Sequence, residues 1–221
     1  MPTNLRLDLL DSPALSGGVG ASAPSQSRAT LLKRALAVGG TVVAGGVAIG
    51  GLPRLALSAP SPAQDTEILN FALQLEYLES AFFSEAAEGG QLRGELLEFA
   101  QTVRGHERAH VAFLQKALGR KARKRPTFDF RNATRDPKAF TSAAVALQDL
   151  MVAAYNGQAA NLTTGAFASA AKIVSVEARH AGWIRAISGN DPAPKATEQP
   201  KTAAAVTAAL NRTRFVKRTS E

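Results

Sequence analysis

The sequence predicts an all-α protein whose core is a four-helix bundle with one long crossover, followed by an additional C-terminal helix. Three observations predict this class. Alanine is abundant and aromatic residues make up only 6% of the 221 residues, which favours helix over sheet. Apolar residues recur at helical spacing over four long segments. The middle connection between these segments is much longer than the other two, so two helical hairpins joined by a crossover are expected.

Residues 1–63 are expected to precede the fold as a disordered leader with an export signal. The first part is rich in Ser, Gly and Pro. Basic residues within 28–34 then lead into an uncharged apolar stretch, 35–53, in the order that an export signal requires. Residues 27–33 resemble the twin-arginine consensus, with Ala29 where the second arginine belongs. We expect a protein of the periplasm or cell envelope; an uncleaved N-terminal membrane anchor is the alternative, because the apolar stretch is just long enough.

The first helix of the bundle is expected over residues 65–88, capped by Asp65 or Thr66 and ended by the Gly-Gly pair that follows. The second is expected over residues 92–118 and stops at Gly119. A short connection joins these two helices, so they should lie antiparallel to each other.

The segment between the hairpins is basic and contains Pro126 and Pro137, so it is expected to be non-helical and to run along the bundle. The second hairpin is expected over residues 138–156 and 164–188, again with a short connection. A Pro-containing linker then leads to a weaker helix over residues 201–216.

Composition and charge exclude several function classes. The absence of cysteine rules out disulfides, Cys-ligated zinc, iron–sulfur clusters and cysteine nucleophiles. The net charge of +8 comes largely from residues 120–125 and 212–218, which we expect to be a loop and a chain end. Because nucleic-acid binding needs a basic face with a recognition element, we expect no nucleic-acid partner and instead a solvated loop or contact with an anionic envelope surface.

Two of the three histidines stand three residues after a glutamate. The pairs are Glu107 with His110 and Glu177 with His180, one on the second helix of each hairpin. Residues i and i+3 share a helix face, so each pair presents a carboxylate and an imidazole to one point. A Glu-x-x-His pair from each of two bundle helices is the pattern of a di-metal site, and its ligands suit iron, manganese or zinc.

The two hairpins also align as an internal repeat. On their first helices, Leu75-Glu76 aligns with Leu147-Gln148, so Glu76 and Gln148 occupy equivalent positions. From this position each first helix is expected to donate one metal ligand. Tyr155 lies two turns from Gln148 on the same face and is the expected hydrogen-bond donor behind the ligands.

These motifs resemble the ferritin-like superfamily of di-iron carboxylate proteins. They are more closely similar to its exported bacterial branch, which plant desiccation-related proteins resemble in turn. The matching segments are residues 68–73, 75–79, 107–114, 148–149, 154–155 and 176–180. The resemblance implies that iron is the cofactor, with manganese or zinc as alternatives. It also implies a metal ligand set made up of Glu76, Glu107, His110, Gln148, Glu177 and His180.

The chain is accordingly expected to have three parts. Residues 1–63 form the leader with its export signal, residues 64–190 form the ferritin-like four-helix bundle, and residues 191–221 form a C-terminal linker and basic helix. The expected partners are metal ions and an envelope or membrane surface, and no oligomeric state is indicated.

Gln148 departs from the four carboxylates of a complete site, because an amide is neutral and a weaker ligand for a hard cation. The metal ion on its side should therefore bind more weakly. Glu79 lies three residues from Glu76 on the same inner face and is the favoured substitute. Asp149 is adjacent to Gln148 but points about 100° away from it on a helix of 3.6 residues per turn.

Two function classes remain open. In the first, two iron ions are oxidised by O2 or peroxide, with Glu107 and Glu177 bridging them, for iron oxidation or protection against oxidative stress. In the second, the chain is a non-catalytic stress or desiccation-type bundle of the cell envelope with a degenerate site or a metal-free polar core. Whether the chain is an enzyme stays open between the two classes. The third histidine, His106, is expected to be exposed or to flank the site.

Overall fold

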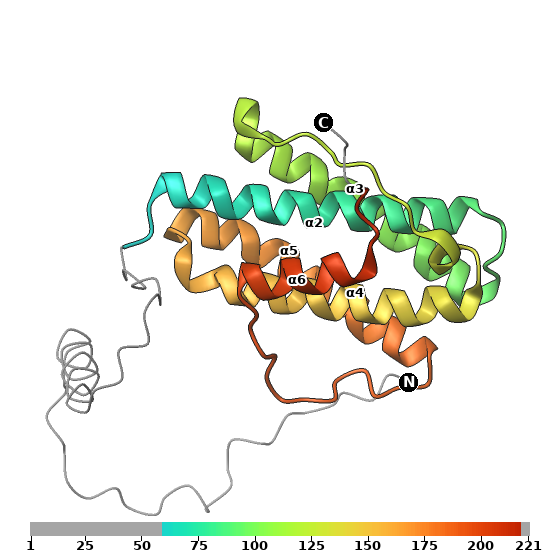
Figure 1. The fold of residues 1–221 in the computed structure, drawn as a ribbon. Helices are drawn as coiled ribbons and strands as arrows, with labels where there is room; N and C mark the ends of the chain where they lie inside the picture. Colours follow the sequence, from blue (N-terminus) through green and yellow to red (C-terminus); the bar gives the residue numbers. More distant parts are fainter. Residues whose placement is uncertain (1–58, 218–221) are drawn as a thin grey trace, which may run out of the picture. The chain divides into compact units, whose positions relative to one another are not determined.

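The computed structural model describes residues 59–217. The expected export signal lies outside the described residues, apart from the last positions of the leader. The described part contains five α-helices and no β-strand (Figure 1). These helices are α2 (Pro62–Glu88), α3 (Gly94–Leu118), α4 (Pro137–Gln158), α5 (Thr164–Ile187) and α6 (Ala203–Thr213). The predicted all-α class, a helical bundle with an additional C-terminal helix, is confirmed.

Helix α2 begins earlier than predicted, and Ser61 caps it in place of Asp65 or Thr66. The Ser61 hydroxyl accepts a hydrogen bond of 3.3 Å from the backbone N–H three residues later, and Pro62 occupies the first turn, where its missing N–H costs nothing. Asp65 instead accepts two hydrogen bonds from Thr163, one from its backbone N–H at 2.9 Å and one from its hydroxyl at 2.6 Å. Asp65 therefore joins the beginning of α2 to the beginning of α5.

The four long helices form two hairpins. Helix α2 packs against α3, and α4 packs against α5; further contacts between α2 and α4 and between α3 and α5 hold the hairpins together (Figure 1). Gly90 and Gly94, at φ 70° and 56°, provide left-handed backbone in the turn between α2 and α3. The neighbours of each helix are thus those expected for two hairpins closed into a bundle.

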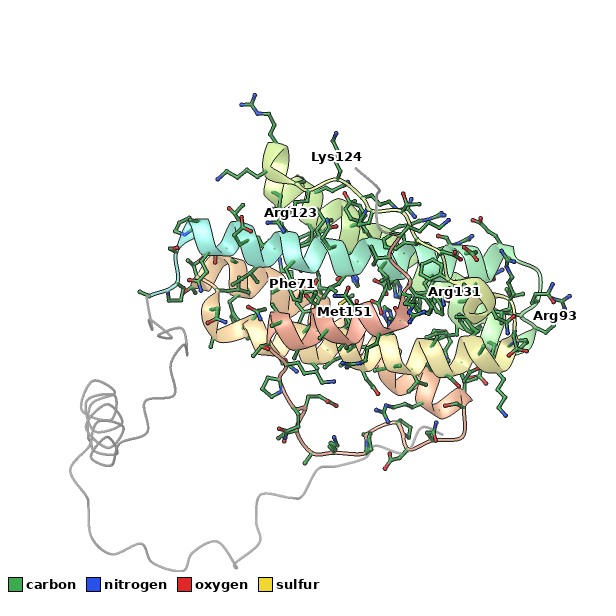
Figure 2. All side chains as sticks on the ribbon, viewed as in Figure 1. Phe71, Arg93, Arg123, Lys124, Arg131 and Met151 are labelled. Atoms are coloured by element: carbon green, nitrogen blue, oxygen red, sulfur yellow. The ribbon has the colours of Figure 1, made fainter. Side chains whose placement is uncertain are left out.

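The connection from α3 to α4 runs along α2. It contains two short 3-10 turns, η2 (Gly119–Lys121) and η3 (Arg131–Thr134), where the sequence predicted no helix. The Asn70 side chain of α2 accepts from the Arg123 backbone N–H at 2.8 Å and donates to the Lys121 carbonyl at 3.0 Å. These bonds fix the backbone of the basic segment on α2, while charged side chains such as Lys124 extend into solvent (Figure 2).

The core consists of two apolar clusters, one in each half of the bundle. The first draws on the early part of α2 and the late parts of α3 and α4, and its members include Leu73, Leu114, Met151 and Tyr155. The second draws on the opposite parts of these helices, and its members include Phe82, Phe83, Phe99, Phe140 and Ile184. Between the two clusters along α2 to α5 lies a layer of buried polar side chains.

Helix α6 lies along α4 (Figure 1) and is shorter than predicted. Its Val206 is fully buried, and Leu210 packs with the cluster that contains Met151 of α4, which Figure 2 labels. After α6, Val216 forms an antiparallel bridge with Phe128 of the crossover. The C-terminal segment therefore covers α4 and joins it to the crossover. None of the helices in residues 59–217 combines the length and the apolar character of a bilayer span.

Candidate metal centre

The polar layer contains every residue that the sequence analysis proposed as a metal ligand. Each of the four long helices contributes at least one of them, and none is more than 9% exposed. The six residues are Glu76 of α2, Glu107 and His110 of α3, Gln148 of α4, and Glu177 and His180 of α5. Their arrangement follows from the helical spacing, because i and i+3 residues of α3 and of α5 point to the same side.

Four of the six residues converge closely. One possible ligand atom from each of Glu76, Glu107, His110 and Glu177 lies within 4.8 Å of the others. The His110 Nδ1 atom lies 3.3 Å from Glu76 Oε2, 3.3 Å from Glu107 Oε2 and 3.0 Å from Glu177 Oε1. Three carboxylates and one imidazole thus surround one point.

His180 faces the other oxygens of the same two carboxylates. Its Nδ1 atom lies 3.3 Å from Glu107 Oε1 and 3.5 Å from Glu177 Oε2. Glu107 and Glu177 therefore each direct one oxygen to His110 and the second to His180. The two imidazole rings are both buried, with centroids 6.3 Å apart. This is an arrangement in which two carboxylates lie between two imidazoles.

Gln148 and Glu79 form a pair at the edge of this group. The Gln148 side-chain amide donates to Glu79 Oε1 at 3.0 Å, and both side chains are buried. Asp149, the neighbouring acid, instead binds Arg185 in a two-pronged ion pair, at 3.1 and 2.5 Å. Of the two acids near Gln148, only Glu79 belongs to the polar layer.

Two further side chains contact the predicted ligands. The Tyr155 hydroxyl donates to Glu76 Oε1 at 2.6 Å, as its position relative to Gln148 suggested. His106 is exposed, yet its Nδ1 atom lies 2.8 Å from His180 Nε2, and the two rings stack with centroids 5.1 Å apart. The sequence did not predict this contact. Its only local signal was the placement of His106 one helical turn before His110.

Burial and mutual repulsion control the protonation of the acids. Burial raises the pKa of Glu107, and the charges of Glu177 and Glu76 raise it further. The pKa of Glu79 is raised by burial and then by Glu107 and Glu177. Without a cation, this layer would therefore retain protons on carboxyl groups that are ionised in water.

The histidine contacts act in the opposite direction on Glu177. Burial alone would raise the pKa of Glu177, but its contacts with His110 and His180 lower it. Burial alone would lower the pKa of His110, but its contacts with Glu107, Glu177 and Glu76 raise it to about 12. In the metal-free chain, a protonated His110 thus occupies the place of a cation among the carboxylates.

Much of the cluster lacks hydrogen bonds. In residues 59–217, the buried side-chain atoms that lack a hydrogen-bond partner all belong to this layer: Glu76 Oε2, Glu79 Oε2, Glu107 Oε1, Gln148 Oε1, both oxygens of Glu177, and His180 Nδ1. Buried polar atoms of native proteins almost always have a partner, because leaving them unpaired costs about 1–3 kcal/mol each. Carboxylate oxygens and imidazole nitrogens are ligands for iron, manganese and zinc. The donor set therefore fits a metal site.

A surface hollow of about 440 Å³ opens between α3 and α5 beside the histidines. His106, His110 and His180 line it, together with Arg179 and Trp183. Trp183 lies half-buried on the wall of this hollow. The predicted ligands thus have one side that small molecules can approach from solvent.

Comparison with known proteins agrees with this architecture. A family model described as a ferritin-like domain matches residues 64–190. The matched residues run from the first turn of α2 to the end of α5 and leave out α6. No curated protein matches the chain.

Proposed function

Because the chain belongs to the ferritin-like domain family, we propose that it binds two divalent metal ions in its buried carboxylate–histidine layer, with iron as the preferred metal. The residues proposed to hold them are Glu76, Glu107, His110, Gln148, Glu177 and His180. His110 with Glu76 would hold one ion and His180 the other, while Glu107 and Glu177 bridge the two. Manganese and zinc are the alternatives to iron, because the same ligand types suit all three.

One observation carries this proposal: the buried unpaired polar atoms of the described residues all belong to this layer. Glu107 and Glu177 each direct their two oxygens to two different histidines, which supports a bridging role. A metal-free polar core would need hydrogen bonds that this group of acids lacks, and its buried carboxylates would have to stay protonated. Two divalent cations satisfy both the charge and the open coordination positions.

A pair of iron ions would supply redox chemistry with O2 or peroxide, and we propose iron oxidation or protection against oxidative stress as the activity. The side chains around the site hold the ligands in position. Tyr155 holds Glu76 through its hydroxyl, and His106 holds His180 through the second ring nitrogen. The hollow between α3 and α5 admits a small oxidant, while the two apolar clusters keep bulk water out.

We also propose that the protein works outside the cytoplasm, on the basis of the export signal expected in residues 1–63. The second function, a non-catalytic bundle of the cell envelope, is supported by one observation. Gln148 donates a hydrogen bond to Glu79, so one side of the layer holds itself together through an amide. Metal analysis separates the two functions.

The test is metal content of the purified full chain after anaerobic loading with Fe²⁺ and removal of excess metal. The wild-type chain should retain iron, and the combined variant His110→Ala with His180→Ala should lose it. Glu107→Gln should also lose it, because the bridging carboxylate becomes a neutral amide. The matched control is Glu98→Gln, which makes the same change at an exposed position of α3 and should retain as much iron as the wild type.

Equal iron in the wild type and the double-histidine variant would show that the ligand assignment is wrong. Negligible iron in both would favour the non-catalytic bundle. For the activity, O2 consumption is followed after air is admitted to the iron-loaded chain. Iron-dependent consumption by the wild type, at a rate above that of free Fe²⁺, is expected only if the site oxidises iron.

A further inference from the structure

We propose that Glu79 supplies the fourth carboxylate of the metal centre, which the neutral Gln148 cannot supply, and that the Gln148 amide serves as its hydrogen-bond donor. This inference rests on the proposed metal-binding function and makes it more specific. The missing acidic ligand of α4 would be replaced by an acid from α2, which would then donate two carboxylates to the site instead of one.

The contacts of Glu79 leave one of its carboxylate oxygens available to a cation. Glu79 is 1% exposed, and only Oε1 has a hydrogen-bond partner, the amide of Gln148 at 3.0 Å. Its Oε2 atom is buried without a partner. An amide that donates to one carboxylate oxygen fixes the plane of that carboxylate and leaves the second oxygen available to a cation.

The geometry of α2 places Glu79 on the same side of the helix as Glu76. Glu76 and Glu79 are separated by three residues, so they lie on the same face of the helix, one turn apart. Glu76 Oε2 lies 3.3 Å from His110 Nδ1, so these two residues would hold the same ion. Glu79 faces α4 through Gln148, the residue aligned with Glu76 in the second hairpin. Glu79 therefore reaches the side of the layer on which α4 lacks an acid.

The charge balance of the site also favours Glu79 as a ligand. With Gln148 as a ligand, the layer supplies three carboxylates, Glu76, Glu107 and Glu177, against the four positive charges of two divalent ions. With Glu79, the layer supplies four carboxylates and the site becomes neutral, which is the state favoured in a low-dielectric interior. The Gln148 carbonyl oxygen, also buried and unpaired, can complete the coordination without adding charge.

The competing explanation is that Glu79 is a protonated acid that only satisfies the Gln148 amide. The two explanations differ in which residue the second ion needs. If Glu79 is the ligand, Glu79→Gln should remove the second ion although an amide pair can still form with Gln148. If Glu79 only satisfies Gln148, then Glu79→Gln should leave metal binding unchanged and Gln148→Leu should remove the second ion.

The experiment is equilibrium dialysis of the metal-stripped full chain against Mn²⁺, with bound metal counted per chain. The wild type should bind two ions. Glu79→Gln should bind one tightly and the second at least about a hundredfold more weakly, beyond the loss typical of residues behind the ligands. Gln148→Leu should still bind two ions, the second about 10–100-fold more weakly than in the wild type, because both the hydrogen bond to Glu79 and a neutral amide ligand are lost. The swapped variant, Glu79→Gln with Gln148→Glu, should bind two ions again because the fourth carboxylate returns from α4.

The matched control is Glu85→Gln. Glu85 also lies on α2 and also accepts one side-chain hydrogen bond, from Thr134 at 2.6 Å, but it is exposed and outside the layer. It should bind two ions as the wild type does. Melting curves of the metal-free variants establish that each is folded before binding is compared.

Each outcome decides the proposal. Two ions bound equally tightly by Glu79→Gln and the wild type would overturn the role of Glu79 and leave the metal-binding function intact. Loss of the second ion in Gln148→Leu but not in Glu79→Gln would also overturn it. A wild type that binds no Mn²⁺ or Fe²⁺ would refute the proposed function together with this inference.

Discussion

Substitution of Tyr155 tests whether its hydroxyl holds the polar layer in position for metal binding. It donates to Glu76 Oε1 at 2.6 Å, and burial together with the charge of Glu76 raises the pKa of Tyr155, so it remains a donor. Tyr155→Phe removes one oxygen atom and leaves both oxygens of Glu76 unpaired. A hydrogen bond to a charged group contributes about 1.5–3 kcal/mol. At about 2–4 °C per kcal/mol for a domain of this size, the metal-free Tm should fall by about 3–12 °C.

The same substitution should weaken Mn²⁺ binding by about 10–100-fold, because Glu76 loses the group that orients it. The matched control is Tyr77→Phe, at a tyrosine buried to a similar extent, whose hydroxyl accepts from Gln115 at 2.8 Å and donates to the Arg123 carbonyl at 3.4 Å, outside the layer. This control should lose only about 0.5–1.5 kcal/mol and keep its Mn²⁺ affinity. Thermal melting with a chelator and calorimetric titration with Mn²⁺ measure the two effects. Unchanged Mn²⁺ affinity in Tyr155→Phe would refute the reasoning that Tyr155 positions a ligand.

Two further predictions concern pH and the C-terminal segment. The stability of the metal-free chain, measured by urea unfolding, should fall as the pH rises from about 5 to about 8. The pKa values of Glu79 and Glu107 are raised and that of His110 reaches about 12, so the folded chain keeps protons that the unfolded chain releases. Mn²⁺ should remove this decline, and a metal-free stability that rises with pH would contradict it. Gly157→Ala should destabilise the chain by about 1–3 kcal/mol and expose α6 to proteolysis, because the new Cβ would lie 1.8 Å from the Lys201 carbonyl oxygen. Gly165→Ala, where the same methyl group meets open space, should have neither effect.

Local spacing explains why part of the site could be predicted from the sequence. Glu107 and His110 share a helix face whatever the surrounding fold, and so do Glu177 and His180, because the i, i+3 relation is a property of one helix. The apolar periodicity and the short connections likewise fix which helices form hairpins. The alignment of Glu76 with Gln148 then indicated which positions of the first helices face the same interior.

Two other contacts between helices could not be predicted in this way. The Gln148–Glu79 bond joins α4 to α2, and the His106–His180 contact joins α3 to α5. Both depend on how far one helix is shifted along its neighbour, and periodicity within a helix carries no information about that shift. Asp65 shows the same limit, because its sequence position suits an N-cap but its carboxylate binds Thr163 at the start of another helix.

The position of the polar layer supports the proposed metal-binding function. It lies between two apolar clusters, one of them rich in stacked and edge-on phenylalanine rings, which could hold the four helices together without it. Replacing buried charges by apolar side chains of similar size is often neutral or stabilising, so stability alone does not explain several acids at this depth. The rigid helices on both sides keep Glu107 and Glu177 directed at two histidines even where hydrogen bonds are missing. Folding of the metal-free chain thus includes the unfavourable free energy of burying this layer, and binding of a pair of cations would offset that free energy.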